Sequence, residues 1–479
     1  MSVAPVPPAE TAAEALAAHL ARHRAAFRAE PFPTHRQRRD RVERLADALD
    51  QRRSAFARAI ASDFGHRSHH ETLLADIAVS VIGLRHTAKH LKRWMKPERR
   101  STPLHFLPAR SRVVPQPLGV VGVISPWNYP VQLAAVPIGQ ALAAGNRVML
   151  KPSELTPATS TELAEMFASL FPDDVVSVHL GGPEVGAAFS SLPFDHLFYT
   201  GSTSVGRLVM QAAARNLVPV TLELGGKSPA LVAPSADLDR AADRIANGKL
   251  FNAGQTCVAP DYVMLPEGQR DAFVHAFRAA VAKRYPRLAD NPDYSGVVNE
   301  RHRARLKALL DDARAKGAEL VPINPAGEDF PDDGPKLVPT LVLGATDDMQ
   351  IMVDEIFGPL LPITTYQRYD EALATVVDRP RPLALYLFDD DSDRIERTLQ
   401  RTHAGGVTVN DCMLHVAQDN LPFGGVGPSG MGAYHGKDGF DTFSHRKAVF
   451  EQPRVNSGFL LDAPFGRTLE RLVDVLTKL

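Results

Sequence analysis

Residues 120–150 read VVGVISPWNYPVQLAAVPIGQALAAGNRVML, an apolar run, a turn, a helical segment and a second largely apolar run. Runs such as 120–124 and 147–150 are typical of strands buried on both faces, and the segment 131–144 between them suits a helical crossover. Three further runs continue this alternation, at residues 175–178, 196–199 and 220–224. The pattern predicts a doubly wound parallel sheet, which binds ligands at the carboxyl ends of its strands.

A second alternation of helical and apolar segments runs from residue 229 to about residue 411. It includes helical patterns at 238–247 and 269–283 and a strand pattern at 383–388. A chain of 479 residues exceeds the size at which one hydrophobic core stops growing. We therefore predict an α/β protein with two parallel-sheet domains, and helices packed on the first sheet over roughly the first 93 residues.

Two segments lack local partners for their apolar residues. Residues 99–117 contain four prolines between apolar positions, which predicts an extended excursion away from the core. Near the C-terminus, apolar residues recur at the spacing of one helical face, but the segment is too short to span a bilayer. That face consists of Leu469, Leu472, Val473, Leu476 and Leu479. We expect it to dock on the body of the enzyme or on a partner subunit, with peripheral membrane contact as the lesser alternative, and we expect a homodimer.

Composition excludes several classes of function. The chain carries 54 Lys and Arg against 55 Asp and Glu, so its net charge of -1 favours neither nucleic acid nor anionic lipid. Two cysteines are too few for a disulfide scaffold, and their spacing is not that of a zinc site. The first ten residues lack the pattern of a signal peptide, and no window is apolar enough to cross a membrane. We expect a cytoplasmic protein without membrane insertion.

Two residues stand out as a candidate nucleophile and a candidate base. Cys257 ends the segment FNAGQTC, whose small residues allow close backbone approach to its thiol. A lone cysteine is commonly a buried apolar residue, and we interpret Cys412 in that way. Glu223 ends a strand run before two glycines. Such a carboxylate is commonly exposed, whereas burial would raise its pKa and let it take a proton from a thiol or from water.

Two strand ends offer groups for binding. Asn128, in the segment SPWNYP after the first strand, could donate its amide to a developing oxyanion, although an Asn before a helix is more commonly a cap or turn residue. Residues 200–207, TGSTSVGR, join a strand to a helix whose free N–H groups suit a phosphate. This segment lacks the endings of a P-loop and of the usual dinucleotide fingerprint, so alone it is a weak signal.

Two other patterns are set aside. The segment GVGPSG at residues 425–430 matches the dinucleotide fingerprint, but no strand precedes it and Pro428 interrupts it. A possible metal cluster lies in a helical pattern near the N-terminus, which favours an exposed helix face over a metal site. That cluster consists of His66, His69, His70 and Glu71. We predict no metal.

Taken together, the motifs resemble the aldehyde dehydrogenase superfamily over residues 115–447. They are PWNYP at 126–130, KPSE at 151–154, ELGGK at 223–227, GQTC at 254–257 and EIFGP at 355–359. Residues 198–202 and 422–445 resemble its class-three branch of aromatic and fatty aldehyde enzymes, and residues 254–262 and 291–294 look most like bacterial coniferyl-aldehyde dehydrogenases. The resemblance implies a cofactor-binding domain at 1–224 with an oligomerisation excursion at 99–117, a catalytic domain at 225–411, and a return segment with oligomerisation elements and a C-terminal helix at 412–479.

The resemblance also implies an NAD(P)-dependent oxidation through a covalent thioester. Cys257 would attack the aldehyde, Asn128 would stabilise the oxyanion, and Glu223 would activate the water that releases the acid. NAD or NADP would contact Trp127, Lys151, Glu154, Gly201, Ser202, Thr203, Ser204, Val205, Gly206, Glu355 and Phe357. Glu154 favours NAD over NADP because it should hydrogen-bond a free ribose hydroxyl and disfavour a 2′-phosphate. Lys151 beside it weakens that preference.

Alternatives remain within this resemblance. The substrate would be a coniferyl-type aromatic aldehyde, with a medium-chain or fatty aldehyde as the alternative. A coenzyme-A-acylating enzyme would pass the thioester to a thiol, but Glu223 argues for water. A silent scaffold is disfavoured because Cys257, Glu223 and Asn128 are all present.

Overall fold

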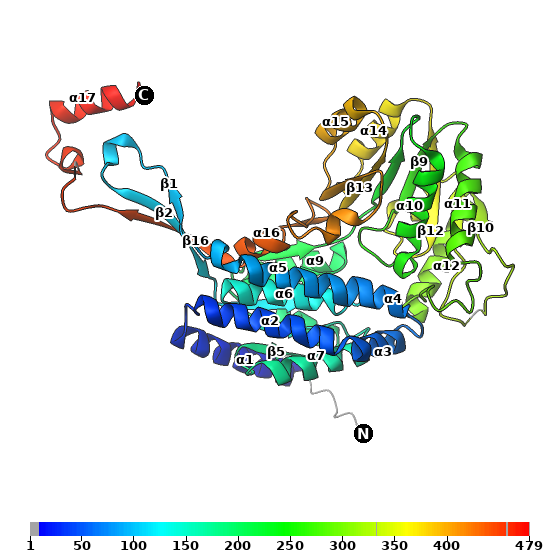
Figure 1. The fold of residues 1–479 in the computed structure, drawn as a ribbon, viewed down its shortest axis with the longest axis horizontal. Coiled ribbons are helices and arrows are strands. Elements are labelled where there is room, and N and C mark those ends of the chain that lie inside the picture. The colour runs from blue at the N-terminus through cyan, green and yellow to red at the C-terminus, as the bar shows by residue number, and fades with distance from the viewer. Residues whose placement is uncertain (1–8, 332, 457, 479) are drawn as a thin grey trace.

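The computed structural model describes residues 9–331, 333–456 and 458–478. Figure 1 shows two α/β bodies side by side and a strand-built arm that extends away from both and ends at helix α17. Each body is built on its own sheet, and a third, smaller sheet forms the arm.

The first sheet has the strand order β15-β7-β6-β3-β4-β5. Its strands are β3 (Val120–Ile124), β4 (Arg147–Lys151), β5 (Val176–Val178), β6 (His196–Thr200), β7 (Val220–Glu223) and β15 (Gly430–Met431). From β3 the chain adds β4 and β5 on one side and then β6 and β7 on the other, all in parallel. The order reverses beside β3, so the loops after β3 and β6 diverge and leave a crevice at the carboxyl ends of the strands.

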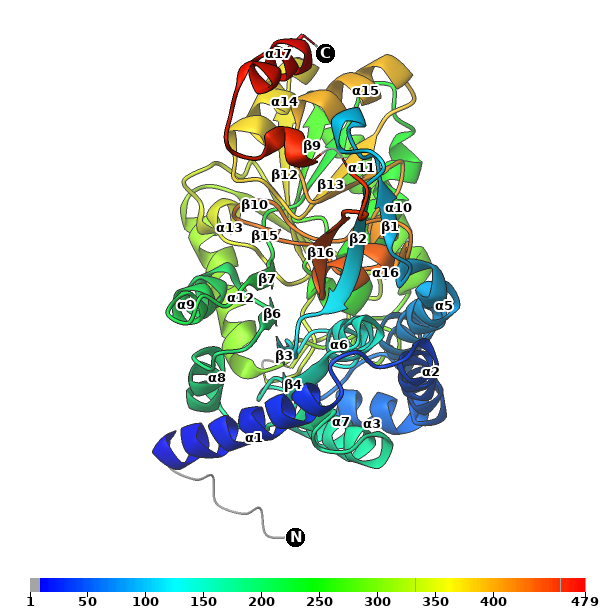
Figure 2. The same ribbon diagram turned by 90° about the vertical axis from the view of Figure 1, so that its left-hand side faces the viewer.

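Helices cover both faces of the first sheet (Figure 2). They are α1 (Ala9–Ala29), α2 (His35–Gln51), α3 (Arg53–Asp63), α4 (His69–Glu71), the π-helix η1 (Thr72–Ala78), α5 (Val79–Trp94), α6 (Gln132–Ala144), α7 (Pro157–Leu170), α8 (Pro183–Ser190) and α9 (Thr203–Ala214). Every residue of α6 is buried, because α2 and α5 cover the side that does not face the sheet. Because the sheet covers one side of α6 and two helices cover the other, its sequence is almost entirely apolar.

The second sheet has the strand order β10-β11-β12-β9-β8-β13-β14. Its strands are β8 (Pro229–Val232), β9 (Tyr262–Pro266), β10 (Glu319–Pro322), β11 (Thr340–Leu343), β12 (Leu360–Tyr366), β13 (Ala384–Phe388) and β14 (Gly406–Val409). Its helices are α10 (Leu238–Leu250), η3 (Phe251–Gly254), α11 (Arg270–Arg284), α12 (Glu300–Ala315), α13 (Gln350–Val353), α14 (Tyr369–Asp378), α15 (Ser392–Arg401) and η4 (Leu414–Ala417). The predicted second α/β unit is therefore confirmed.

The arm is a three-stranded antiparallel sheet in the order β1-β2-β16. Its elements are β1 (Glu98–Arg100), η2 (Leu104–Phe106), β2 (Arg110–Pro117) and β16 (Ser444–Glu451), with α16 (Gly436–Thr442) before it and η5 (Gly458–Leu461) and α17 (Arg467–Leu476) after it. Residues 99–117, the segment predicted to be an extended excursion, contribute β1, η2 and β2 to this arm. Helix α17 has no buried residue and lies beyond the arm in Figure 1, so it does not dock on the body of its own chain. Leu479, predicted on its apolar face, lies outside the described residues.

The sheets are not wholly parallel, which corrects the sequence prediction at two edges. Strand β10 pairs antiparallel with β11, and β15 pairs antiparallel with β7. A parallel neighbour needs a long crossover, usually helical. Among the described residues between β10 and β11 there is no helix, and the two-residue β15 belongs to the segment that returns from the second sheet. In the described part of the chain, no helix combines the length and apolarity needed to cross a bilayer.

Candidate active site

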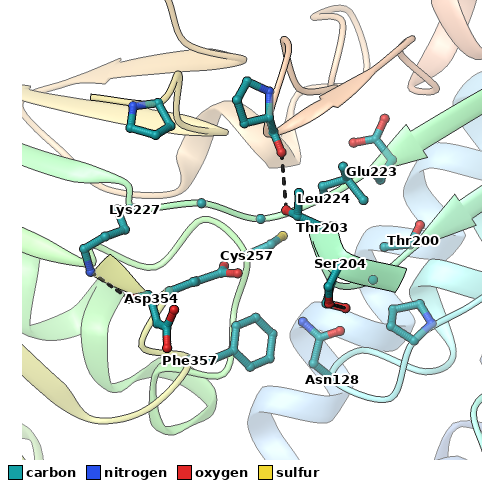
Figure 3. Close-up of a pocket in the computed structure, with 18 of the residues that line it drawn as sticks. Asn128, Thr200, Thr203, Ser204, Glu223, Leu224, Lys227, Cys257, Asp354 and Phe357 are labelled. Carbon is teal, nitrogen blue, oxygen red and sulfur yellow. Dashed lines mark hydrogen bonds between the residues drawn. The ribbon is translucent and has the colours of Figure 1, made fainter. Parts of the chain in front are cut away.

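A cleft of about 980 Å³ opens where the carboxyl ends of the first sheet face the second body. Segments 126–128, 200–204 and 223–227 line it from the first body, and Cys257 and residues 352–355 line it from the second. Figure 3 shows Asn128, Glu223, Cys257 and Phe357 around this one space. The structure therefore brings together the three predicted catalytic residues, which are far apart in the sequence.

The loop that carries Cys257 is held in an unusual backbone conformation. After α10, Asn252 and Ala253 adopt left-handed φ values of 52° and 51°, and Gly254 follows with φ 75°. A Cβ at Gly254 would lie 2.3 Å from the carbonyl oxygen of Gly358, so only glycine fits there. The side chain of Gln255 then donates to the carbonyl oxygen of Asn252 at 3.0 Å and accepts the backbone N–H of Val298, shortly before α12, at 2.9 Å. These bonds fix the loop below the thiol.

Asn128 contacts the same loop directly. Its side-chain amide donates to the carbonyl oxygen of Gln255 at 3.2 Å, which leaves its second N–H for a ligand. The next residue, Tyr129, shares a 2.5 Å hydrogen bond with the hydroxyl of Thr256. Val131, and not Asn128, occupies the N-cap position of α6, and no side chain accepts a cap hydrogen bond there. The capping alternative for Asn128 is therefore wrong.

Glu223 ends β7 and is 2 % exposed. Neither of its carboxylate oxygens has a hydrogen-bond partner. Burial alone raises its pKa well above the usual value of a glutamate. The alternative of an exposed carboxylate is therefore wrong, and burial makes the ionised side chain a stronger base than an exposed glutamate.

The thiol of Cys257 is also held in its neutral form. Burial raises its pKa to about 12, and the nearby carboxylates of Glu355 and Glu223 add to the shift. Glu355 has a pKa raised to about 8, chiefly by burial and then by Asp261. A nucleophilic thiolate at Cys257 thus requires a neighbouring group to remove its proton.

The cleft contains groups suited to a dinucleotide. Ser202 caps α9 by accepting the N–H of Val205 at 3.4 Å, and the first residues of this helix, Thr203 and Ser204, line the cleft, where a helix start suits a phosphate. A Cβ at Gly225 would lie 2.1 Å from the carboxylate of Glu355, so glycine leaves that acid open to the cleft. One oxygen of Glu355 is buried without a partner, as expected where a ligand hydroxyl would complete its hydrogen bonds. These residues fit a nicotinamide dinucleotide.

The other predicted cofactor residues divide into two groups. Trp127, Gly201, Thr203, Ser204 and Phe357 line the cleft, and the rings of Trp127 and Phe357 meet edge-to-face at 5.3 Å. Lys151 and Glu154, at the end of β4, are not among the lining residues and form a 2.7 Å ion pair with each other. Val205 and Gly206 lie one turn into α9, also outside the lining.

Several lining residues are missing from the sequence prediction. His302 and Arg305 on α12 face the cleft, and the ring of His302 lies 5.0 Å from that of Trp127. Arg305 donates to the backbone carbonyl oxygen of Glu355 at 3.2 Å, which holds the EIFGP loop. Pro428 also lines the cleft, so the rejected GVGPSG segment contributes to its wall. No local sequence pattern identifies these residues, because they reach the site only through the packing of elements that are distant in the sequence.

The predicted exposed cluster at residues 66–71 is only partly correct. His69 and His70 are exposed, as expected for a solvated helix face. Glu71 is buried, and its carboxylate accepts the backbone N–H of Asn252 at 3.0 Å. The interpretation of Glu71 as a surface residue is therefore wrong, because a contact 181 residues away in sequence buries it.

Comparison with known proteins agrees with this architecture. The chain matches the aldehyde dehydrogenase family over residues 3–449. It is 54% identical over 458 residues to a probable coniferyl aldehyde dehydrogenase of Pseudomonas aeruginosa, covering 96% of this chain and 95% of the relative. It is 52% identical over 441 residues to a coniferyl aldehyde dehydrogenase of a Pseudomonas species, covering 92% and 91%.

A solved structure supports the same assignment. The substrate-bound aldehyde dehydrogenase AldH of Staphylococcus aureus superposes with a TM-score of 0.90 at 37% identity, covering 96% of this chain and 99% of that one. The two sheets, the cleft between them and these matches lead to one conclusion. The chain belongs to the aldehyde dehydrogenase family and catalyses the NAD(P)-dependent oxidation of an aldehyde.

Proposed function

We propose that this enzyme oxidises a coniferyl-type aromatic aldehyde to its carboxylate, using NAD and a thioester on Cys257. The observation that carries the mechanism is Glu223, a buried carboxylate without partners in the same cleft as the thiol. The substrate class is supported by the names of the relatives that are 54% and 52% identical over nearly the whole chain.

The first step forms a bond between the sulfur of Cys257 and the aldehyde carbon. The thiol must lose its proton for this, since its pKa is raised to about 12. Glu223 is the group we propose to accept that proton, directly or through a water. The carbonyl oxygen becomes an oxyanion as the C–S bond forms, and the second N–H of the Asn128 amide can stabilise it.

Oxidation then requires the loss of hydride from the same carbon. NAD(P), when bound, supplies the acceptor for this hydride. The groups that would hold it are the start of α9 for its phosphates, Glu355 and Phe357 for its nicotinamide side, and Lys151 with Glu154 for its adenosine ribose. As the hydride leaves, the oxyanion becomes a carbonyl again, and the carbon remains bound to the sulfur as a neutral thioester.

Water completes the reaction. It attacks the thioester carbon, and the C–S bond breaks. The sulfur of Cys257 is set free and the product leaves as a carboxylate. Glu223 would first release to solvent the proton that it took from the thiol, and would then take the proton of the attacking water, which a neutral carboxyl could not do. The buried base Glu223 also disfavours transfer of the thioester to coenzyme A, because that transfer does not require a base to activate water.

A substrate panel tests this proposal. Coniferyl aldehyde, a benzaldehyde-type aldehyde and a medium-chain aliphatic aldehyde are each offered with NAD and with NADP, and kcat/KM is compared. We expect coniferyl aldehyde with NAD to give the highest value. Preference for the aliphatic aldehyde would overturn the substrate class, and release of an acyl-coenzyme A instead of the free acid would overturn the water route.

We further propose a cytoplasmic homodimer with the three-part division given above. A free thiol at Cys257 suits a reducing compartment. The arm exposes apolar side chains that its own chain leaves uncovered, among them Leu104 at 78% and Phe450 at 51%. A second copy of the chain is the partner we propose for this surface.

A further inference from the structure

Arg67 is a buried arginine that reaches the proposed oxyanion residue from behind. Its guanidinium lies over the rings of Phe64 and Tyr129, at 5.2 and 5.1 Å from their centroids. Its Nη1 donates to the backbone carbonyl oxygen of Asn128 at 3.0 Å. The side chain has no access to solvent. A charged group buried in this way holds the backbone of Asn128 in one position.

Glu71, one helical turn later, holds the nucleophile loop in the same manner. Its Oε1 accepts the backbone N–H of Asn252 at 3.0 Å, and its Oε2 accepts the hydroxyl of Ser295 at 2.6 Å. Asn252 is the first left-handed residue of the loop that leads to the thiol. Its own side-chain amide donates to the carbonyl oxygen of Asn128 at 3.1 Å, so both contacts converge on one peptide group.

The π-helix η1 turns the carboxylates of Glu71 and Asp76 toward one side, where both approach Arg67. In an α-helix Asp76 would lie about 140° around the axis from Glu71. The i→i+5 hydrogen bonds of residues 72–78 widen the helical turn. Residues five apart therefore lie nearly above one another. Arg67 is thereby 3.7 Å from the carboxylates of both Glu71 and Asp76. Asp76 in turn accepts the N–H of Val131 at 3.1 Å.

From these contacts we infer that Arg67 and Glu71 are positioning residues for the reaction. They hold the Asn128 peptide and the Asn252 turn together, and so keep the oxyanion amide aligned with the sulfur of Cys257. Neither side chain lines the cleft, so neither touches substrate or cofactor. The inference rests on the roles proposed above for Cys257 and Asn128.

Two substitutions at Glu71 separate positioning from general stability. Glu71→Ala removes the acceptor for Asn252, and we expect kcat to fall roughly 10–100-fold with little change in KM for NAD, because small misplacements of reacting groups cost rate. Glu71→Gln keeps an oxygen that can accept the same N–H, and Asp76 still balances Arg67. We expect it to retain kcat within a few fold. The burst of NADH in the first turnover should fall in the first variant only.

Asp391→Ala is the matched control. Its carboxylate also accepts two backbone N–H groups, at 3.0 Å each, but at the start of α15 and away from the cleft lining. It should lower the melting temperature and leave kcat unchanged. If Glu71→Ala does not fold, Glu71→Asp, one methylene shorter, should show an intermediate loss of kcat.

Three outcomes would overturn the inference. They are unchanged kcat in Glu71→Ala, an equal loss in Glu71→Gln and Glu71→Ala, or an equal loss in the Asp391→Ala control. The proposed function is tested separately by Cys257→Ser. Activity in that variant would overturn the catalytic assignment, whereas an inactive Cys257→Ser beside a fully active Glu71→Ala would overturn only the positioning role.

Discussion

At the scale of single residues, the two cysteines differ by location and not by acidity. Burial raises the pKa of both thiols, and that of Cys412 lies well above its usual value. Only Cys257 lines the cleft, whereas Cys412 is packed in the core. We predict that Cys257→Ser abolishes NADH formation from an aldehyde, since a hydroxyl is a far weaker acid than a thiol.

The matched variant is Cys412→Ser. It should keep most of the activity and lose only some thermal stability, because it places a hydroxyl in an apolar site. Equal loss of steady-state activity in the two variants would show that the nucleophile has been assigned incorrectly.

Glu223→Gln tests the proposed base. The amide cannot accept a proton, so release of the thioester should slow and kcat should fall roughly 10²–10⁴-fold. A slowed first burst of NADH would show that Glu223 also takes the proton of the thiol, and a rapid burst followed by slow turnover would limit its role to deacylation. Turnover at the wild-type rate would exclude both roles.

The dependence of kcat on pH is a second test of Glu223 as the base. Because burial raises the pKa of Glu223, its basic form becomes populated only as pH rises, and wild-type activity should rise with it. In Glu223→Gln the part of this rise that belongs to the carboxylate should be absent. A rising limb of the same shape in both enzymes would assign it to another group.

Sequence reasoning predicted Cys257, Glu223 and Asn128 because each lies in a short motif beside a strand or loop end. It misjudged Glu71, whose pattern Ser-His-His-Glu is that of an ordinary helix start. Ser68 does cap this helix, by accepting the N–H of Glu71 at 3.2 Å. The burial of the glutamate depends on Asn252 and Ser295, which no local pattern connects to it.

At the scale of elements, the strands and helices of the sheets follow from the apolar periodicity of the sequence. The π-helix η1 does not, because its apolar residues would suit an α-helix equally well and its extra residue is fixed only by tertiary contacts. The antiparallel edges β10 and β15 were also missed, since pairing direction depends on the path of the connecting segments.

The nucleophile loop offers a prediction at this scale. Gly254 combines a φ of 75° with a Cβ position only 2.3 Å from the carbonyl oxygen of Gly358. Gly254→Ala should therefore cost about 3 kcal/mol or more in stability and also lower kcat, because the strained loop carries Cys257. Thermal unfolding and steady-state kinetics measure the two effects.

Gly268→Ala separates backbone strain from crowding. Gly268 has a φ of 89°, but no atom lies within 4 Å of its Cβ position. This variant should lose only about 1–2 kcal/mol, the cost of a left-handed conformation, and keep its kcat. If Gly254→Ala behaved in the same way, the contact with Gly358 would not restrict the loop.

At the scale of the whole molecule, the arm and α17 are the parts that a single chain leaves uncovered. Figure 1 shows both extending away from the two α/β bodies. Val455, between β16 and α17, is 85% exposed, and no residue of α17 is buried. Apolar surface of this kind is typical of an interface, which is why we propose a second copy of the chain as its partner.

Deleting residues after Gly466 tests this arrangement. Leu469, Leu472 and Leu476 share one face of α17, so their removal should weaken the dimer at least roughly tenfold, or about 1.4 kcal/mol. Cofactor affinity should not change, because no residue of α17 lines the cleft and the helix lies beyond the arm (Figure 1). Sedimentation across micromolar concentrations measures the dimer, with Arg471→Glu, on the opposite charged face, as the control. A monomeric intact enzyme would contradict the proposal. Tight liposome binding by the intact chain, abolished by the deletion, would instead identify a membrane surface as the partner.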